Sequence, residues 1–238
     1  MRRFQRFLLC ALGAIAIWPA AAPAQDGWGW STIIPSVTGT DTLGQALRQG
    51  MQEPHPQAGA AAAEAAGFRY TPSRERRAAN LAGFVARSRA ADPQGADNLA
   101  KVFASTDVIE QMRAPLDAVG LRIDDVADAY AVWWINAWQA SRGVDDDVSR
   151  ATALAVRNQA ARAMAASGML READDAVKQE TAESLLIQAA LIADALKQSQ
   201  GNPELSRKVA AAVSQGARGM SIDLASMTLT EAGFVPAE

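Results

Sequence analysis

The run from Asp124 to Ala140 constrains the fold more than any other part of the chain, because it holds three of the six tryptophans and one of the two tyrosines. At about 100° per residue, its aromatic and apolar side chains cover an arc of roughly 200° around a helix, which is wider than the apolar stripe of a surface helix. Asp124 and Asp125 suit the N-cap and first turn, and Gly143 can supply a left-handed C-cap. The run therefore predicts a buried central helix.

The chain from residue 68 onward has the pattern of a helical bundle, because apolar residues recur at helical spacing between capping signals. The predicted helices begin at or near the following residues: Ser73, Asp92, Asp107, Asp147, Asp174 and Pro203. No stretch shows sustained period-two alternation, and we expect the apolar tail from Ser221 to Pro236 to fold back in irregular form. The predicted fold class is all-α, a single bundle of about six to seven helices around the Trp-rich helix.

Two local patterns lead to more specific expectations. In the first helix, Leu81 and Phe84 mark the core face, and Arg77 is expected largely outside it. Asp145 to Asp147 resemble a metal cluster, but consecutive side chains on a helix point in different directions and would not converge on one ion. We interpret them as the N-cap and first turn of a helix over about residues 147–167.

The first 24 residues have the features of a secretory signal peptide. Three arginines precede an apolar run from Phe7 to Trp18, and Ala22-Pro23-Ala24 offers the small residues that a signal peptidase requires. The alternative is a membrane anchor, but the apolar run is shorter than the ~20 residues of a membrane span. We therefore predict cleavage after residue 24, a periplasmic or secreted protein, and no stable membrane span after cleavage.

Residues 25–67 have no periodic pattern and are expected to form a flexible leader ahead of a helical domain at residues 68–238. Trp28 and Trp30 stand out in this leader. They could pin it to the domain itself or to a partner, and packing on the protein's own surface is the favoured interpretation.

Composition excludes several kinds of chemistry. The one cysteine, Cys10, lies in the predicted signal peptide, and the one histidine, His55, lies between two prolines in the leader. The mature chain therefore lacks a thiol for catalysis or a disulfide and lacks the ligands of a usual zinc site, so we expect no metal and no cofactor. Removing the three arginines of the signal leaves 20 basic against 26 acidic residues, a formal charge of −6, which argues against a nucleic-acid partner.

Paired carboxylates are the enzymatic chemistry that remains open to this composition. Glycoside cleavage by two carboxylates needs one acid with a raised pKa in an apolar pocket and a second one nearby. The candidates are Asp128, beside the tryptophans, and Glu180 or Glu183 on the long helix that starts near Asp174. Charged residues at the border of an apolar face are usually only its solvated edge, which is the alternative for all three.

The polar side of the Trp-rich helix carries the candidate binding residues Asp128, Asn136 and Gln139, with Trp134 as the candidate aromatic contact. Polar groups on a buried helix must find partners. They form either an internal network, for example with Arg122 or an arginine of the first helix, or one wall of a ligand pocket. The internal network is favoured because buried polar networks mostly serve structure.

Four segments resemble a family of exported proteobacterial proteins that carry a domain of unknown function. They are Phe68-Arg69-Tyr70-Thr71-Pro72-Ser73, Gly120-Leu121-Arg122, the run from Val126 to Gln139, and Leu229-Thr230-Glu231-Ala232-Gly233-Phe234. The resemblance covers roughly residues 68–235 and is most specific in the tryptophan run. It implies an exported helical domain and transfers no catalytic or binding residue.

These observations favour a periplasmic, non-enzymatic helical module that binds a protein partner or an envelope component. One alternative is a small carboxylate hydrolase acting on cell-wall glycan, with Asp128 as its first candidate acid. Another is a small-molecule carrier, in which the tryptophans stack on the ligand. The sequence indicates no particular oligomeric state.

Overall fold

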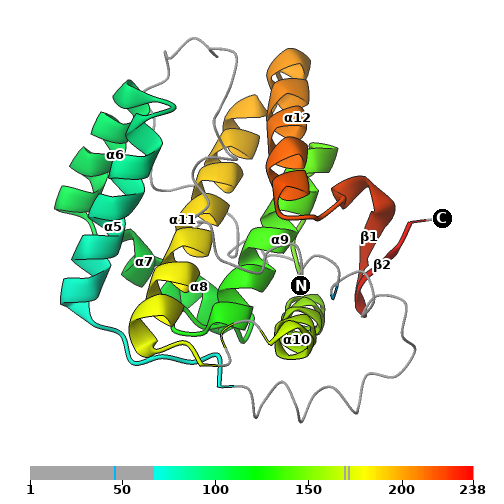
Figure 1. The fold of residues 1–238 in the computed structure, drawn as a ribbon. Helices are drawn as coiled ribbons and strands as arrows, with labels where there is room; N and C mark the ends of the chain where they lie inside the picture. The colour runs from blue at the N-terminus through cyan, green and yellow to red at the C-terminus, as the bar shows by residue number, and fades with distance from the viewer. Residues whose placement is uncertain (1–45, 47–66, 169, 171, 238) are drawn as a thin grey trace.

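The computed structural model describes residue 46, residues 67–168, residue 170 and residues 172–237 (Figure 1). The predicted signal peptide lies outside this part of the chain, as does the predicted leader apart from Ala46 and Gly67, so both boundaries stay predictions. Cys10, Trp28, Trp30 and His55 also lie outside it. Ala46 is helical and packs, half-buried, against the hydrophobic core.

The all-α prediction is confirmed. The helices are α5 (Arg74–Arg89), α6 (Pro93–Ser105), α7 (Val108–Gln111), α8 (Arg113–Ala118), α9 (Val126–Arg142), α10 (Arg150–Ser167), α11 (Asp175–Ser199) and α12 (Pro203–Gly219). A 3₁₀ turn (Leu224–Ser226) leads to two short strands, β1 (Met227–Thr230) and β2 (Gly233–Pro236). None of the helices in the described part of the chain is long and apolar enough to cross a membrane.

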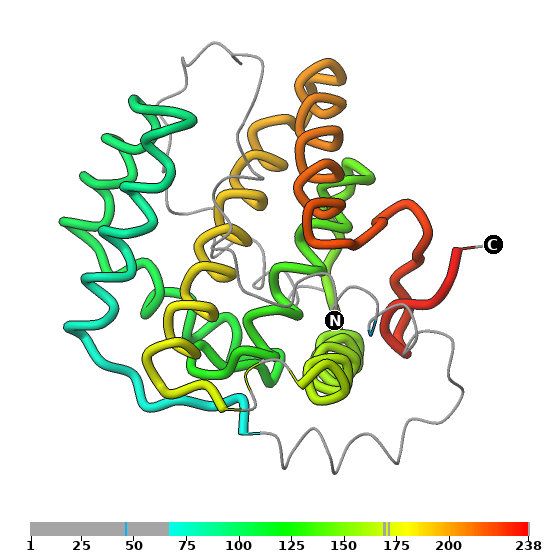
Figure 2. The backbone as a smooth tube through the Cα atoms, in the orientation of Figure 1, coloured from blue at the N-terminus to red at the C-terminus, as the bar shows by residue number. Residues whose placement is uncertain are grey.

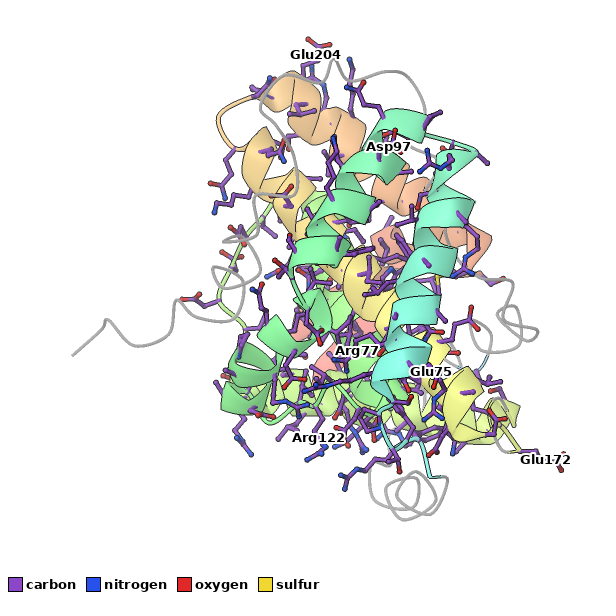
Figure 3. All side chains as sticks on the ribbon, turned by 90° about the vertical axis from the view of Figure 1, so that its left-hand side faces the viewer. Glu75, Arg77, Asp97, Arg122, Glu172 and Glu204 are labelled. Atoms are coloured by element: carbon purple, nitrogen blue, oxygen red, sulfur yellow. The ribbon has the colours of Figure 1, made fainter. Side chains whose placement is uncertain are left out.

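The Trp-rich helix α9 lies at the centre of the bundle, as predicted. Helices α10, α11 and α12 all pack on it, with α10 running across the bundle so that it is seen end-on in Figures 1 and 2. Every residue from Val126 to Ala137 is buried. Helices α5 and α6 form an outer pair that joins the bundle through α5 and α11, and they face the viewer in Figure 3.

The ends of α9 are fixed by the predicted residues. The Asp125 carboxylate accepts hydrogen bonds from the backbone N–H groups of Ala127 and Asp128 at 2.9 and 3.1 Å, and so caps two otherwise unpaired donors. Gly143 ends the helix with a φ of +65°, a left-handed conformation in which glycine carries no steric penalty. Local chemistry therefore sets the length of the central helix.

The predicted start of α10 was wrong. The N-cap is Ser149, whose hydroxyl accepts from the backbone N–H of Thr152 at 3.1 Å, and the helix starts at Arg150 rather than near Asp147. Val148, just before the cap, and Ala153, in the first turns, are both buried in the core. A buried apolar residue at this position fixes the angle at which the chain enters the helix, and this packing outweighs the capping preference of the preceding aspartates.

The tail folds back on the bundle as predicted, but the expectation that it is irregular was wrong. Strands β1 and β2 pair antiparallel, with Met227 opposite Pro236 and Leu229 opposite Phe234. Four residues per strand are too few for period-two alternation to stand out in the sequence. Gly233, at a φ of +97°, allows the chain to leave the turn and re-enter the sheet.

Candidate functional site

Asp128 lies in the first turn of α9 and is 4% exposed. One of its carboxylate oxygens accepts from the backbone N–H of Arg122 at 3.0 Å, and the other accepts from Nε of Arg157, on α10, at 3.1 Å. The carboxylate therefore connects three segments: the loop before α9, α9 itself, and α10.

A second buried carboxylate lies beside this contact. The Arg157 guanidinium is also 3.6 Å from Asp125, whose other oxygen caps α9. One arginine therefore faces two buried carboxylates. Arg122 contributes its backbone to Asp128, whereas its guanidinium binds Asp124 through two contacts of 2.9 Å.

Burial is the largest influence on the Asp128 carboxyl, because the charged form loses its hydration. Together with the neighbouring Asp125 carboxylate, burial raises the pKa of Asp128 to about 7, although Arg157 favours the ionised form. A carboxyl that exchanges a proton near neutral pH can act as a general acid or base if a substrate reaches it. This is the one described feature at the predicted site residues that suits catalysis.

Asn136 and Gln139 do not join Asp128. The Asn136 amide donates to the Val132 carbonyl of its own helix at 2.8 Å, and the Gln139 amide donates to the Asp146 carbonyl at 2.7 Å. Within the described residues, the side-chain oxygens of both are buried and accept no hydrogen bond. The polar side of α9 is thus divided among separate partners.

Trp134, the predicted aromatic contact, is fully buried. Its indole N–H points to the sulfur of Met227 at 3.1 Å, and its ring stacks on Phe234 at 4.3 Å between centroids, with 25° between the ring planes. The side chain packs against the C-terminal hairpin and thereby anchors the tail of the chain to the central helix.

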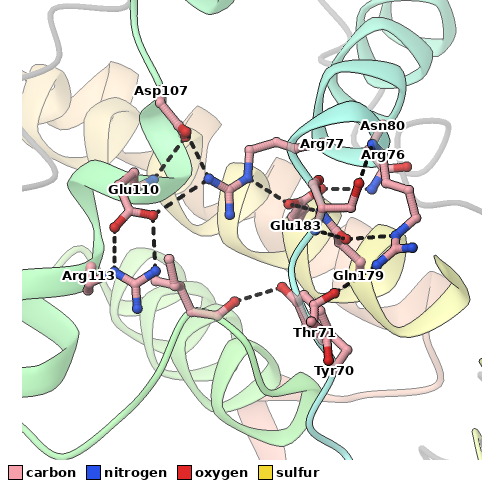
Figure 4. A network of polar contacts seen from close by, with 12 residues as sticks. Tyr70, Thr71, Arg76, Arg77, Asn80, Asp107, Glu110, Arg113, Gln179 and Glu183 are labelled. Carbon is pink, nitrogen blue, oxygen red and sulfur yellow. Dashed lines mark hydrogen bonds and ion pairs between the residues drawn. The ribbon is translucent and has the colours of Figure 1, made fainter. Parts of the chain in front are cut away.

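A larger polar network lies between α5, α7 and α11 (Figure 4). At its centre, the fully buried Glu183 accepts from Nε of Arg77 at 2.8 Å, from Asn80 at 2.7 Å and from Gln179 at 2.9 Å. Arg77 also reaches Asp107, the N-cap of α7, at 2.8 Å. Arg77 and Asn80 thus join α5 to α11 through the Glu183 carboxylate, and Gln179 supports it from within α11.

The expectation that Arg77 lies largely outside the core face was wrong, since it is buried. The spacing of Arg77 could have predicted its burial. Arg77 lies four residues before Leu81 and seven before Phe84, which places all three on one side of a helix. Arg157 had no comparable signal, because its partner Asp128 lies 29 residues away. Glu180, the other candidate carboxylate of α11, is partly exposed and lies 3.4 Å from Arg87.

Within residues 67–168, 170 and 172–237, no group of three or more histidine, cysteine, aspartate or glutamate residues is arranged to hold a metal ion. Asp145, the first of the three adjacent aspartates, accepts from the side-chain amide of Gln200 at 3.0 Å. All three aspartates lie in the loop before α10, and Asp145 connects this loop to the end of α11.

Comparison with known proteins gives one match. No curated protein and no solved structure matches the chain. A family model matches residues 35–235, and so reaches further toward the N-terminus than the helical domain predicted at residues 68–238. The chain belongs to this family, which is a family of unknown function, DUF6683.

Proposed function

We propose that this protein is an exported, non-enzymatic helical module that binds a protein partner or an envelope component. The observation that carries the proposal is the use made of its candidate catalytic carboxylates. Asp128 accepts from Arg122 and Arg157, and Glu183 accepts from three side chains of its network. Carboxylates with these partners hold helices together and present no free oxygen to a substrate.

Export is supported by the sequence pattern of residues 1–24, and it can be tested separately. Mass spectrometry of the exported fraction should show a mature protein that begins near Gln25. An intact Met1 in that fraction would contradict the signal peptide.

Binding is tested by adding purified mature protein to isolated cell-wall sacculi and to a periplasmic extract, with unlabelled protein as competitor. Saturable retention on one of them supports the proposal, and its absence from both contradicts it.

The carboxylate hydrolase remains the second candidate, because the pKa of Asp128 is raised to about 7 beside the second carboxylate of Asp125. Incubation with peptidoglycan fragments, followed by chromatography of the soluble products, separates the two functions. A hydrolase releases product with the wild-type chain and loses at least about 100-fold of this activity in Asp128→Asn, as expected for the loss of a general acid. A binding module releases no product with either chain.

A further inference from the structure

The C-terminal hairpin is held by an aromatic pocket on α9. Phe234 is fully buried, its ring stacks on Trp134, and Trp138 meets it edge-on at 6.2 Å between centroids. Met227, at the other end of the hairpin, places its sulfur against the Trp134 indole N–H at 3.1 Å. Two side chains of the tail therefore insert between side chains of one helix, at the edge of the molecule seen on the right of Figure 1.

Helices α9 and α10 also bind the backbone of the hairpin. The Gln159 amide, on α10, donates to the Phe234 carbonyl at 2.7 Å and accepts from the Phe234 N–H at 2.8 Å. Trp138 and Arg142 donate to the Met227 carbonyl at 2.9 and 3.2 Å. Side chains of these two helices therefore hold both the main chain and the apolar side chains of the hairpin.

The hairpin is joined to the rest of the fold in a way that allows it to leave as a unit. Among the described residues, no backbone–backbone hydrogen bond links residues 227–236 to a helix, and the two strands pair with each other. The connection from α12 passes through Ser221, whose φ of +58° is left-handed, and then through Ile222 and Leu224, which are buried in the core and would leave together with the hairpin. A residue with a Cβ is strained in this conformation, and short strained links favour exchange of the segment between copies.

We propose that α9 and α10 form a peptide-binding groove that residues 227–236 fill in cis, and that the same segment of a second copy fills it in trans. A second copy is the partner that fits, because its tail can repeat each contact with Phe234 and Met227. Exchange of hairpins between two copies is reciprocal, so the assembly closes as a dimer. This inference does not rest on the proposed function.

The balance between the two forms depends on the hinge and on protein concentration. Groove contacts are the same in cis and in trans, so they do not favour either form. Exchange relieves the left-handed strain at Ser221, whereas dilution favours the closed monomer. Substitutions at this one residue should therefore shift the dimer equilibrium without touching the groove.

The experiment compares Ser221→Gly, Ser221→Pro and Ser221→Ala in the full mature chain by size-exclusion chromatography with light scattering over a concentration series. Glycine tolerates a positive φ, so Ser221→Gly should raise the dissociation constant of the dimer about tenfold per hinge. Proline cannot adopt a φ of +58° and should strengthen it. Alanine keeps the left-handed strain, so its dimer should be closer in strength to that of the wild type than the dimer of the glycine variant is.

A synthetic peptide of residues 224–237 tests the groove directly. Added in excess, it should lower the dimer fraction of Ser221→Pro, whereas the same peptide with Phe234→Ala should not. If Ser221→Pro does not fold, as judged by circular dichroism, the glycine variant and the peptide test on the wild type still apply. The proposal is overturned if no variant dimerises, or if a dimer forms that responds neither to the hinge nor to the peptide.

Discussion

Two buried carboxylates, Asp128 and Glu183, have different surroundings. Glu183 is paired with one buried arginine and two amide donors, which leaves it with three partners. Asp128 shares Arg157 with Asp125, so it competes with a neighbour of like charge for one cation. At the scale of single residues, burial of the carboxyl is the main reason why proton exchange near neutral pH is expected at Asp128, and this competition adds to it.

The raised pKa of Asp128 predicts that stability falls as pH rises. The carboxyl has a pKa of about 4 in an unfolded chain and about 7 in the folded protein, so the folded state binds the proton more tightly between these values. The contribution of Asp128 to the free energy of unfolding is complete below about pH 4 and is lost as pH rises through about 7. Asp128→Asn cannot ionise and should remove this dependence.

Urea denaturation at about pH 5 and about pH 8 measures the effect. The difference in unfolding free energy between the two pH values should be smaller in Asp128→Asn than in the wild type. Asp146→Asn, at an exposed position, should behave as the wild type does. Equal differences in all three chains would show that Asp128 does not titrate in this range.

Arg77 offers a second prediction at this scale. Arg77→Met should destabilise the protein by about 3–5 kcal/mol, because the fully buried Glu183 carboxylate loses its cation. Adding Glu183→Gln removes the stranded charge and keeps one carbonyl oxygen as an acceptor for Asn80 or Gln179, so the double variant should be more stable than Arg77→Met. Thermal unfolding of both chains decides the order, and a less stable double variant would contradict the account.

At the scale of elements, one capping side chain decides where most of the helices start. Ser73, Asp92, Asp107 and Asp174 each accept a backbone N–H of the helix that follows. Asn202 does the same for α12, directly before Pro203. Helix α10 follows the same rule through Ser149, although three aspartates precede this residue.

The choice of Ser149 over the aspartates as the cap of α10 can be tested with two alanine variants. Ser149→Ala should cost about 1 kcal/mol of unfolding free energy, the usual value of an N-cap hydrogen bond. Asp147→Ala should change stability by no more than about 0.5 kcal/mol, because it is exposed and precedes the cap. Urea titrations of the two variants give both values. A larger loss of unfolding free energy in Asp147→Ala than in Ser149→Ala would indicate that the aspartates cap the helix.

At the scale of the whole molecule, bulky aromatic side chains on α9 fill the space between helices rich in alanine. Trp134→Ala should cost about 3–5 kcal/mol, because it removes a fully buried side chain and its stacking on Phe234. Trp134→Phe, which keeps an aromatic ring there, should cost less. Denaturant unfolding measures both, and a loss below about 1 kcal/mol for alanine would place the ring at a surface.

The sequence predicted the central helix because its evidence is local. The caps at Asp125 and Gly143 and the aromatic arc of α9 all lie within one run of the chain. The hairpin could not be predicted in this way, because four-residue strands carry little periodicity. Its position depends on Gln159, whose side chain meets Phe234 75 residues later.

The candidate site was predictable to the same limited extent. The burial of Asp128 followed from the expectation that the whole helix is buried, and the need for a partner followed from its burial. The partner itself, Arg157, depends on how α10 crosses α9, which no local pattern encodes. Asn136 and Gln139 share a helix face with Asp128, but a shared face does not bring separate side chains to one site.

The contact between Gln159 and Gly233 has a consequence for how the family varies. A Cβ at residue 233 would lie 2.4 Å from the Gln159 side-chain oxygen, so no larger residue fits there while the glutamine keeps its place. The two positions should therefore co-vary among relatives. Because a φ of +97° also strains residues other than glycine, chains with a side chain at position 233 should be few, and they should carry a shorter residue at position 159. An alignment in which the two vary independently would show that the hairpin docks differently elsewhere in the family.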